Sequence, residues 1–238
     1  MSHSTRELFR EDAYLKTHPA TVLAADERGV ILDQTIFYAM GGGQPGDTGM
    51  LRLPDGSALA IVDTRRGATA GEILHLTARG AAPPAPGTAV TMEIDWQRRH
   101  RLMRMHTCLH VLTAVVPGPV NGGSVREDSG RLDFDLQGER LDRAEIETRL
   151  NELLARGAAV TTEWVGEEEL LARPELVKTM SVKPPTGFGK IRLLRIAGID
   201  LQACGGTHVA DIAEIGPVLV TRIESKGKQN RRVSVAFA

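Results

Sequence analysis

Two pairs of side chains that commonly bind metal ions lie far apart in the sequence. His106 and His110 are four positions apart in the stretch RMHTCLH, and Cys204 and His208 are four positions apart in CGGTH. Residues four apart on a helix lie about 40° from each other around the axis, so the two histidines would project from one face. The glycine pair in CGGTH permits a tight turn in which the thiolate and the imidazole converge.

The combined donor set is one that zinc prefers. Three imidazole nitrogens and one thiolate sulfur match the ligands of zinc sites in proteins. Two helical histidines alone more often form a partly exposed face than a metal site, so the second pair decides the interpretation. We therefore expect one Zn²⁺ per chain, and the expected ligands are His106, His110, Cys204 and His208. If all four bind, catalysis needs the coordination to expand, a ligand to dissociate, or the ion to shape the pocket instead.

Two classes of zinc enzyme do not fit the sequence. Zinc proteases carry H-E-x-x-H on a helix, and here Thr107 stands where their glutamate general base would be. Nucleobase deaminases carry H-x-E and P-C-x-x-C motifs, and neither occurs in this chain.

The histidine pair is expected on a helix. From Leu102 to Val116 apolar residues recur every three or four positions, which predicts an amphipathic helix ended by Pro117 and Gly118. Cys108 lies about 200° around this helix from His106, so we expect it to be buried as a small apolar residue and not to bind the metal.

The remaining patterns predict an α+β protein in two domains. Residues 1–95 contain short β-branched segments and a PDGS turn, which predict a small β-barrel or meander. Residues 96–238 would form an α+β domain with an antiparallel sheet and packed helices. Its expected elements are strands in 130–136, 158–165 and 190–203, helices in 142–157 and 166–176, and a hairpin in 216–238.

The composition is that of an ordinary globular protein with a core of aliphatic residues. Hydrophobic residues make up 42% and aromatic residues 4%, and the net charge is −1. A nucleic-acid site must therefore be a local basic surface. The two cysteines allow no disulfide framework, and no apolar run approaches the roughly 18 residues of a membrane span. We expect a cytoplasmic protein that does not associate with membranes.

A glycine-rich stretch allows two interpretations. GGGQPG formally matches the dinucleotide motif G-x-G-x-x-G, but Pro45 interrupts it and a strand pattern follows it, so no nucleotide cofactor is expected. It is either a flexible turn or a loop whose bare backbone lets RNA approach. On the second interpretation Gly41, Gly42, Gly43 and Gln44 are candidate RNA-binding residues.

Basic residues gather at two further places. Lys226, Lys228, Arg231 and Arg232 lie at the tip of the expected C-terminal hairpin. A second group, close before and within the histidine helix, consists of Arg98, Arg99, Arg101 and Arg104. Such side chains can contact phosphates, although a run of charges is more often a solvated face.

Three motifs in this order resemble a known family. LDQTIFYAMGGGQPGDTG, HTCLH and CGGTHVADIAEIGP look like the free-standing alanyl-tRNA editing proteins called AlaX. These are similar to the editing domain of alanyl-tRNA synthetase and, more distantly, of threonyl-tRNA synthetase. The resemblance extends from about Thr35 to Arg232, and the glycine-rich part resembles the longer members. Cys108 and Ala39 differ from the residues usual in the family, but neither is one of the four expected zinc ligands.

The resemblance implies a hydrolase that acts in trans. Its expected substrate is mischarged tRNA(Ala), chiefly seryl-tRNA(Ala), with glycyl-tRNA(Ala) as a second candidate and alanyl-tRNA(Ala) spared. The family's zinc ligands map onto the four residues named above. An ATP-binding domain is not expected, and the protein would be a monomer or weak dimer.

Editing needs a contact that distinguishes serine from alanine. A pocket that hydrogen-bonds the serine hydroxyl discriminates strongly, because alanine would leave its polar groups unpaired. Thr107, Ser124 and Thr207 are the candidates for this catalytic-site contact, but each of them could instead orient a ligand. Glu127 and Asp128 are candidate proton acceptors or part of a solvated turn. Zinc could activate water, polarise the ester or hold the substrate amino group.

Two other functions stay open at this stage. An RNA-binding module with a purely structural zinc is consistent with four protein ligands. A general zinc amidohydrolase would lack an evident base and would not require tRNA.

Overall fold

A computed structural model describes residues 4–136, 140–172, 176, 190–227 and 229–238. The chain forms two compact units. The first consists of Met1–Gly41 and Pro45–His100, and the second of Gly42–Gln44 and Arg101–Ala238. The three residues Gly42–Gln44 therefore pack with the second unit, although the chain on both sides of them belongs to the first.

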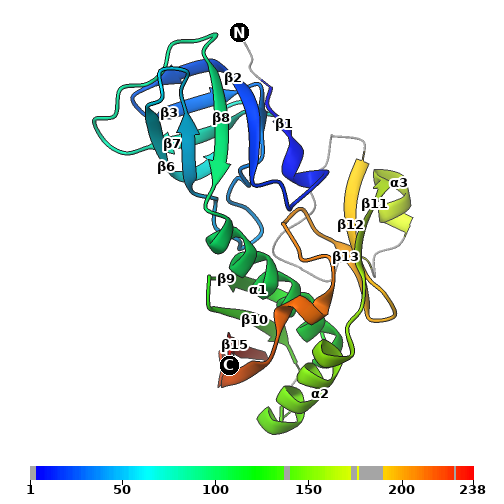
Figure 1. Ribbon diagram of the computed structural model, residues 1–238. Helices are drawn as coiled ribbons and strands as arrows, with labels where there is room; N and C mark the ends of the chain where they lie inside the picture. The colour runs from blue at the N-terminus through cyan, green and yellow to red at the C-terminus, as the bar shows by residue number, and fades with distance from the viewer. Residues whose placement is uncertain (1–3, 137–139, 173–175, 177–189, 228) are drawn as a thin grey trace. The chain divides into compact units, whose positions relative to one another are not determined.

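The first unit is built on a closed barrel of antiparallel strands (Figure 1). In order around the barrel these are β2 (Thr17–Asp26), β3 (Gly29–Leu32), β7 (Ile73–Thr77), β6 (Ala58–Arg66), β5 (Gly49–Arg52) and β8 (Ala89–Ile94). Beside it lie β1 (Arg6–Glu7), the 3₁₀ turn η1 (Leu8–Arg10) and β4 (Gln34–Thr35), with β1 and β4 paired in parallel. The expected small β-barrel is confirmed.

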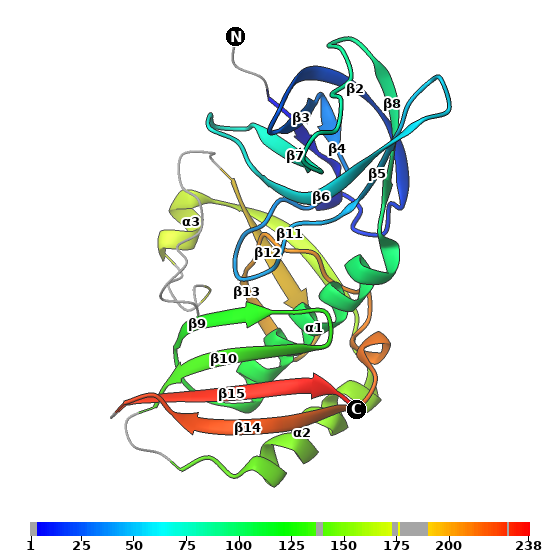
Figure 2. The ribbon, with the colours of Figure 1, turned by 90° about the vertical axis from the view of Figure 1, so that its left-hand side faces the viewer.

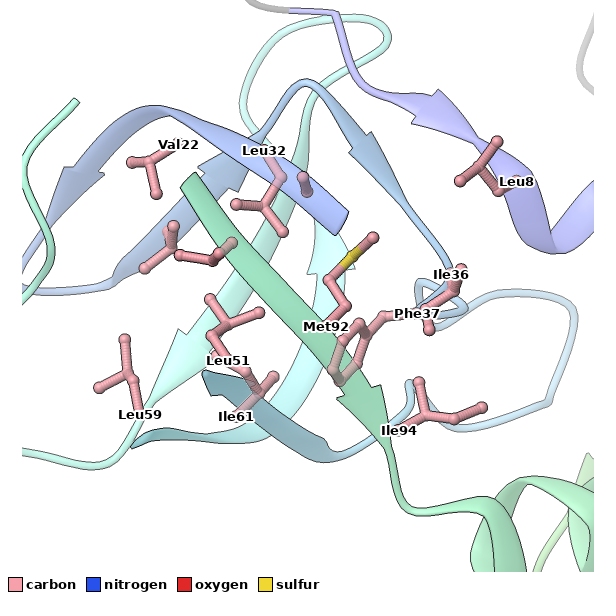
Figure 3. Close-up of a cluster of buried hydrophobic side chains, with 13 residues drawn as sticks. Leu8, Val22, Leu32, Ile36, Phe37, Leu51, Leu59, Ile61, Met92 and Ile94 are labelled. Carbon is pink, nitrogen blue, oxygen red and sulfur yellow. The ribbon is translucent and has the colours of Figure 1, made fainter. Parts of the chain in front are cut away.

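Alternating apolar residues fill the barrel. Val22, Leu32, Leu51 and Met92 come from four different strands and are at most 1% exposed. Figure 3 shows these side chains gathered in one cluster with Phe37. Burial of aliphatic side chains thus stabilises the barrel, as the sparse aromatic content predicts.

One polar side chain, His75 on β7, is buried with this apolar core. Its Nδ1 lies 3.0 Å from the carbonyl oxygen of Val30, and its Nε2 lies 2.7 Å from Oγ1 of Thr35. These partners suit a neutral ring, with Nδ1 donating to the carbonyl and Nε2 accepting from the hydroxyl. Burial lowers the pKa of His75 to about 4.

The start of the histidine helix is held in the first unit by a buried ion pair. Arg99 is 0% exposed and donates from Nε to Oδ2 of Asp47 at 2.8 Å. It also donates to the carbonyl oxygens of Ile36 and Ala13. A guanidinium enclosed in this way cannot reach a phosphate, so the expectation of an RNA contact at Arg99 is wrong.

The described residues of the second unit form two antiparallel sheets. Figure 2 shows the four-stranded sheet of β14 (Val218–Ser225), β15 (Asn230–Phe237), β10 (Ser129–Asp135) and β9 (Val120–Val125). The three-stranded sheet consists of β11 (Val160–Gly166), β12 (Lys190–Ile196) and β13 (Asp200–Ala203). The helices are α1 (Trp96–Val115), α2 (Arg143–Arg156) and α3 (Glu167–Ala172), with the 3₁₀ turn η3 (Ile212–Ile215). The α+β prediction is confirmed.

Helix α1 is more deeply buried than an amphipathic helix. Every residue from Met105 to Leu112 is buried, including Cys108, which the one-sided apolar pattern placed away from the metal site. One face packs on the four-stranded sheet, where a side chain on Gly130 would meet Met105 and Leu109. Eight consecutive buried residues point in every direction around the axis, so the helix is covered on more than one side, which a single apolar stripe does not reveal. Within the described segments, no helix has the length and hydropathy of a membrane span.

The buried His75 predicts acid sensitivity. Its folded-state pKa of about 4 lies below the ordinary value of 6.5, so the unfolded chain takes up this proton first. The contribution of His75 to stability is complete above pH 6.5 and is lost as the pH falls toward 4, and its full size is on the order of 3 kcal/mol. Urea unfolding of wild type and His75→Asn from pH 7 to 4 measures the effect. The difference in unfolding free energy between the two proteins should shrink as the pH falls, and pH curves that stay parallel would contradict this account.

Candidate metal centre

The four expected ligands converge. His106 and His110 lie on α1, Cys204 directly follows β13, and His208 lies before η3. One donor atom from each side chain lies within 4.8 Å of all the others. The sulfur of Cys204 is 3.2 Å from Nε2 of His208 and 3.7 Å from Nε2 of His106. A tetrahedral zinc ion separates its N and S donors by about 3.3–3.8 Å, and the two distances from the sulfur are close to this range.

The three histidines of the cluster are buried, and Cys204 is half-buried. The ring centroids of the three histidines are 4.4–5.2 Å apart, and the histidines are 5–7% exposed. Cys108 is fully buried elsewhere on α1, and burial raises the pKa of its thiol to about 12, so it does not offer a thiolate to a metal.

Each histidine ring faces an oxygen atom on its Nδ1 side. Nδ1 of His106 lies 2.7 Å from Oε1 of Gln44, and Nδ1 of His208 lies 3.1 Å from Oγ1 of Thr107. Nδ1 of His110 lies 3.5 Å from Oδ2 of Asp200. When Nδ1 carries the proton, Nε2 is left as the donor atom, which is the arrangement of metal-binding histidines.

The turn that carries Cys204 is fixed by Arg192 on β12. The Nη1 of this buried guanidinium donates to the carbonyl oxygens of Cys204 at 3.1 Å and of Gly206 at 2.8 Å. In return the amide of Cys204 donates to the carbonyl oxygen of Arg192. These bonds anchor both ends of the C-G-G segment to the neighbouring strand.

Gly206 lets the turn lie directly against α1. A Cβ at this position would lie 2.3 Å from Cε1 of His106 and 2.9 Å from Oε1 of Gln44. A methyl group here would have to displace the imidazole of His106 and the Gln44 side chain that contacts it. The glycine is therefore required by close approach to a ligand.

The electrostatics favour a bound cation. Burial alone would raise the pKa of the Cys204 thiol, but the three neighbouring imidazoles lower it well below its usual range. Burial opposes a charge on His110, yet the Cys204 thiolate and Asp200 raise its pKa to about 9. Burial also lowers the pKa of His208 to about 3. The site thus holds a thiolate and a carboxylate that attract positive charge, as well as neutral imidazole.

Three residues assigned to substrate or RNA from the sequence have other partners. Gln44 is 0% exposed, and besides His106 it binds Thr207, whose hydroxyl accepts from Nε2 of Gln44 at 2.8 Å. Thr107 is also 0% exposed, and its hydroxyl donates to the carbonyl oxygen of Met103. A side chain without exposed surface cannot contact RNA, so the assignment of the Gln44 side chain to RNA binding is wrong, and its partner is His106 instead. Thr107 contacts the ring of His208, whereas Thr207 contacts Gln44 and no member of the cluster.

Ser124 and the glycine loop lie in more accessible positions. Ser124 is half-buried on β9, whereas Gly42 and Gly43 are exposed and Gly41 is half-buried. Gly43 has a φ of +83°, and its carbonyl oxygen accepts from the amide of Val125 at 2.9 Å. The loop backbone is thus held against β9 and still offers exposed glycines.

The basic hairpin is partly neutralised. Arg232 makes two bonds to Asp133, and Arg231 donates to Oγ of Ser225 at 3.0 Å. Lys226 is exposed and lies 3.5 Å from Glu224, and Lys228 lies outside the described residues.

Several other charged candidates also have defined surroundings. Arg101 donates to the carbonyl oxygen of Glu127, and Arg104 donates to that of Ile215. Arg98 donates to the carbonyl oxygen of Gly46. Glu127 and Asp128 are exposed between β9 and β10, where a solvated turn explains them.

Two residues that contact the cluster were missed by the sequence analysis. Arg192 on β12 and Asp200 on β13 are buried charged residues. In β12, Arg192 shares a strand face with Leu194 and Ile196, and a charge on an apolar face is the signal that could have marked it.

Comparison with known proteins places the chain in a family. Residues 191–234 match the threonyl and alanyl tRNA synthetase second additional domain, and residues 9–98 match tRNA synthetases class II (A). The chain is 33% identical to the alanyl-tRNA editing protein AlaX-M of Saccharolobus solfataricus, over 96% of this chain and 97% of that protein. The chain belongs to the AlaX-M family.

Other relatives agree with this membership. The AlaX-M protein of Methanosarcina mazei is 35% identical over 96% of this chain and 95% of its own length. The alanine–tRNA ligase of Pyrobaculum neutrophilum is 36% identical over 92% of this chain, which corresponds to 25% of the ligase. The AlaX resemblance inferred from the three motifs is confirmed.

The contact of Gly206 with His106 makes a prediction for this AlaX-M chain. Gly206→Ala should lose most of its zinc affinity, because the new methyl group displaces the imidazole of His106. Gly166→Ala is the matched control, since a Cβ there meets no atom within 4 Å. Zinc binding is measured by competition with a chromophoric chelator. Equal affinity of the two variants would show that the turn does not press on the ligand.

Gln44 makes a second prediction. Gln44→Met keeps the size of the side chain but removes the acceptor for Nδ1 of His106, and zinc affinity should fall about 10- to 100-fold. Gln97→Met, at an exposed position on α1, should bind zinc as wild type does. Chelator competition on both proteins tests this, and an unchanged affinity in the Gln44 variant would refute the orienting role.

Proposed function

We propose that this AlaX-M protein hydrolyses, in trans, the ester bond of tRNA(Ala) that carries the wrong amino acid. The main substrate is seryl-tRNA(Ala), glycyl-tRNA(Ala) is the second, and alanyl-tRNA(Ala) is spared. The convergence of His106, His110, Cys204 and His208 supports this most directly, because it is a zinc-type donor set in a relative of proteins named for alanyl-tRNA editing.

Hydrolysis of an aminoacyl ester requires little chemical activation by the site. An aminoacyl ester is already activated, so hydrolysis needs a positioned water and stabilisation of the negative charge that develops. A bound Zn²⁺ supplies a Lewis acid for that charge. The protein's part is to present neutral imidazoles and a thiolate: Gln44 and Thr107 fix the rings of His106 and His208, and Arg192 fixes the turn of Cys204.

Selectivity requires a hydroxyl contact that alanine cannot make. With Thr107 and Thr207 occupied inside the unit, Ser124 is the remaining candidate of the three. It is half-buried on β9, where the strand lies against Gly43 of the glycine loop. A polar group placed there favours seryl over alanyl ester by the bond that only serine forms.

The tRNA is held through its backbone. Gly42 and Gly43 expose main chain that a sugar-phosphate strand can approach, and Lys226 and Arg231 offer positive charge at the β14–β15 turn. Contacts of this kind position RNA without reading its sequence, and they weaken as salt rises.

A second function is favoured by one observation. Four protein donors enclosed at 5–7% exposure of the histidines are typical of structural zinc sites. In that case the metal stabilises the fold, and the protein binds RNA but has no hydrolase activity.

The test is deacylation of seryl-, glycyl- and alanyl-tRNA(Ala) by the purified zinc-loaded protein. Wild type should rapidly release serine, release glycine more slowly and leave alanine attached. Cys204→Ala should lose the activity while circular dichroism shows a folded protein. Cys108→Ala is the matched control, because it removes the other cysteine, which lies outside the donor set, and its activity should be retained.

The outcomes separate the two functions. Hydrolysis of the seryl ester that disappears in a folded Cys204→Ala protein supports the deacylase. Absence of hydrolysis by zinc-loaded wild type, together with unfolding of Cys204→Ala, refutes the deacylase and supports the RNA-binding module.

A further inference from the structure

The third histidine of the centre, His110, differs from the other two in its partner. The other two histidines face neutral side chains, those of Gln44 and Thr107. Nδ1 of His110 instead faces a carboxylate, that of Asp200. Asp200 begins β13, and its side chain is 0% exposed. Burying a carboxylate is energetically unfavourable unless a positive charge or a strong hydrogen-bond donor contacts it.

Nδ1 of His110 is itself an unsatisfied buried atom. It forms no hydrogen bond among the described residues, and Oδ2 of Asp200 stands 3.5 Å from it. This separation is an ion-pair distance, and it exceeds the ordinary N–H···O length by only about 0.5 Å. Asp200 is therefore placed to accept the Nδ1 proton that a metal-binding tautomer of His110 must carry.

A ring of polar contacts fixes Asp200 relative to His110. Nε2 of Gln202 donates to Oδ2 of Asp200 at 2.5 Å and to Oγ1 of Thr113 at 3.2 Å. The Thr113 hydroxyl in turn donates to the carbonyl oxygen of His110 at 2.8 Å. The imidazole and the main chain of the same histidine are thus tied to one network, which restrains both the carboxylate and the ring.

The net charge of a metal-loaded site favours a carboxylate at this position. A divalent ion bound by three neutral imidazoles and one thiolate retains a net positive charge within the protein, where water screens it poorly. Arg192 adds another positive charge beside Cys204. A carboxylate hydrogen-bonded to a ligand compensates such charge and makes the imidazole a stronger donor.

We propose that Asp200 is the positioning residue of His110: its carboxylate accepts the Nδ1 proton, holds Nε2 as the donor atom and strengthens this ligand toward a divalent cation, with Gln202 and Thr113 fixing its place. The inference rests on the proposed function only in that it requires the four donors to bind a metal. It makes no claim about which ester is hydrolysed.

The experiment measures zinc affinity of the full chain by chelator competition, together with the absorption spectrum of the Co²⁺-loaded protein. Asp200→Asn keeps the shape of the side chain and removes its charge. It should bind zinc about 10- to 100-fold more weakly and shift the Co²⁺ absorption bands. Asp133→Asn is the matched control, because it removes a carboxylate paired with Arg232 on the four-stranded sheet, away from the donors. Its zinc affinity and Co²⁺ spectrum should match those of wild type.

A second measurement needs no substitution. In the zinc-loaded wild type, long-range ¹H–¹⁵N spectra report which nitrogen of each histidine carries the proton. A proton on Nδ1 of His110, further downfield than those on His106 and His208, supports the proposal. A proton on Nε2 of His110, or an Asn variant with wild-type affinity and Co²⁺ spectrum, would overturn it. Failure of wild type to bind zinc would refute the metal centre itself, whereas zinc binding without hydrolysis would refute only the deacylase.

Discussion

The second unit depends on the close approach of two chain segments that are distant in sequence. The backbone of Gly206 lies so near His106 that a single methyl group would collide with the imidazole ring. This contact brings the thiolate of Cys204 within 3.7 Å of the first histidine, and the same turn delivers His208. Arg192 holds the turn from one side, and Gln44 meets it from the other by accepting from the amide of Thr207. The four donor side chains converge because all these contacts are formed together.

Each of the three histidine rings has its own polar partner. Gln44 belongs to the Gly42–Gln44 segment, which packs with the second unit although its neighbours in the chain belong to the first. Thr107 comes from α1 itself and Asp200 from β13, so the partner of each ring lies on a different element. Such independent supports keep donor atoms in place better than one shared support would, because no single local fluctuation releases all three.

Local features of the site could be predicted from the sequence, whereas features that depend on distant partners could not. The spacing of His106 and His110 on a helix is a property of a few consecutive residues, and the helix and both hairpins were expected for the same reason. The buried ion pair of Arg99 with Asp47 joins residues on separate elements, so Arg99 looked like a surface arginine.

The same reason explains the errors at the site. Gln44 is polar and lies among glycines, which suggested RNA, but its partners are contributed by α1 and by the turn after β13. The sequence around Asp200 did not mark it as a site residue, because its contact is with a histidine on another element. In general, the donor set follows from residue types and spacing, and the residues that orient the donors follow only from the tertiary structure.

The central claim is that the four side chains bind one zinc ion together. X-ray absorption at the zinc edge of the stoichiometrically loaded protein tests it most directly. The account predicts a shell of three nitrogen donors at about 2.0 Å and one sulfur donor at about 2.3 Å, with the sulfur lost in Cys204→Ala. A shell made only of nitrogen and oxygen, or one unchanged by that substitution, would contradict it.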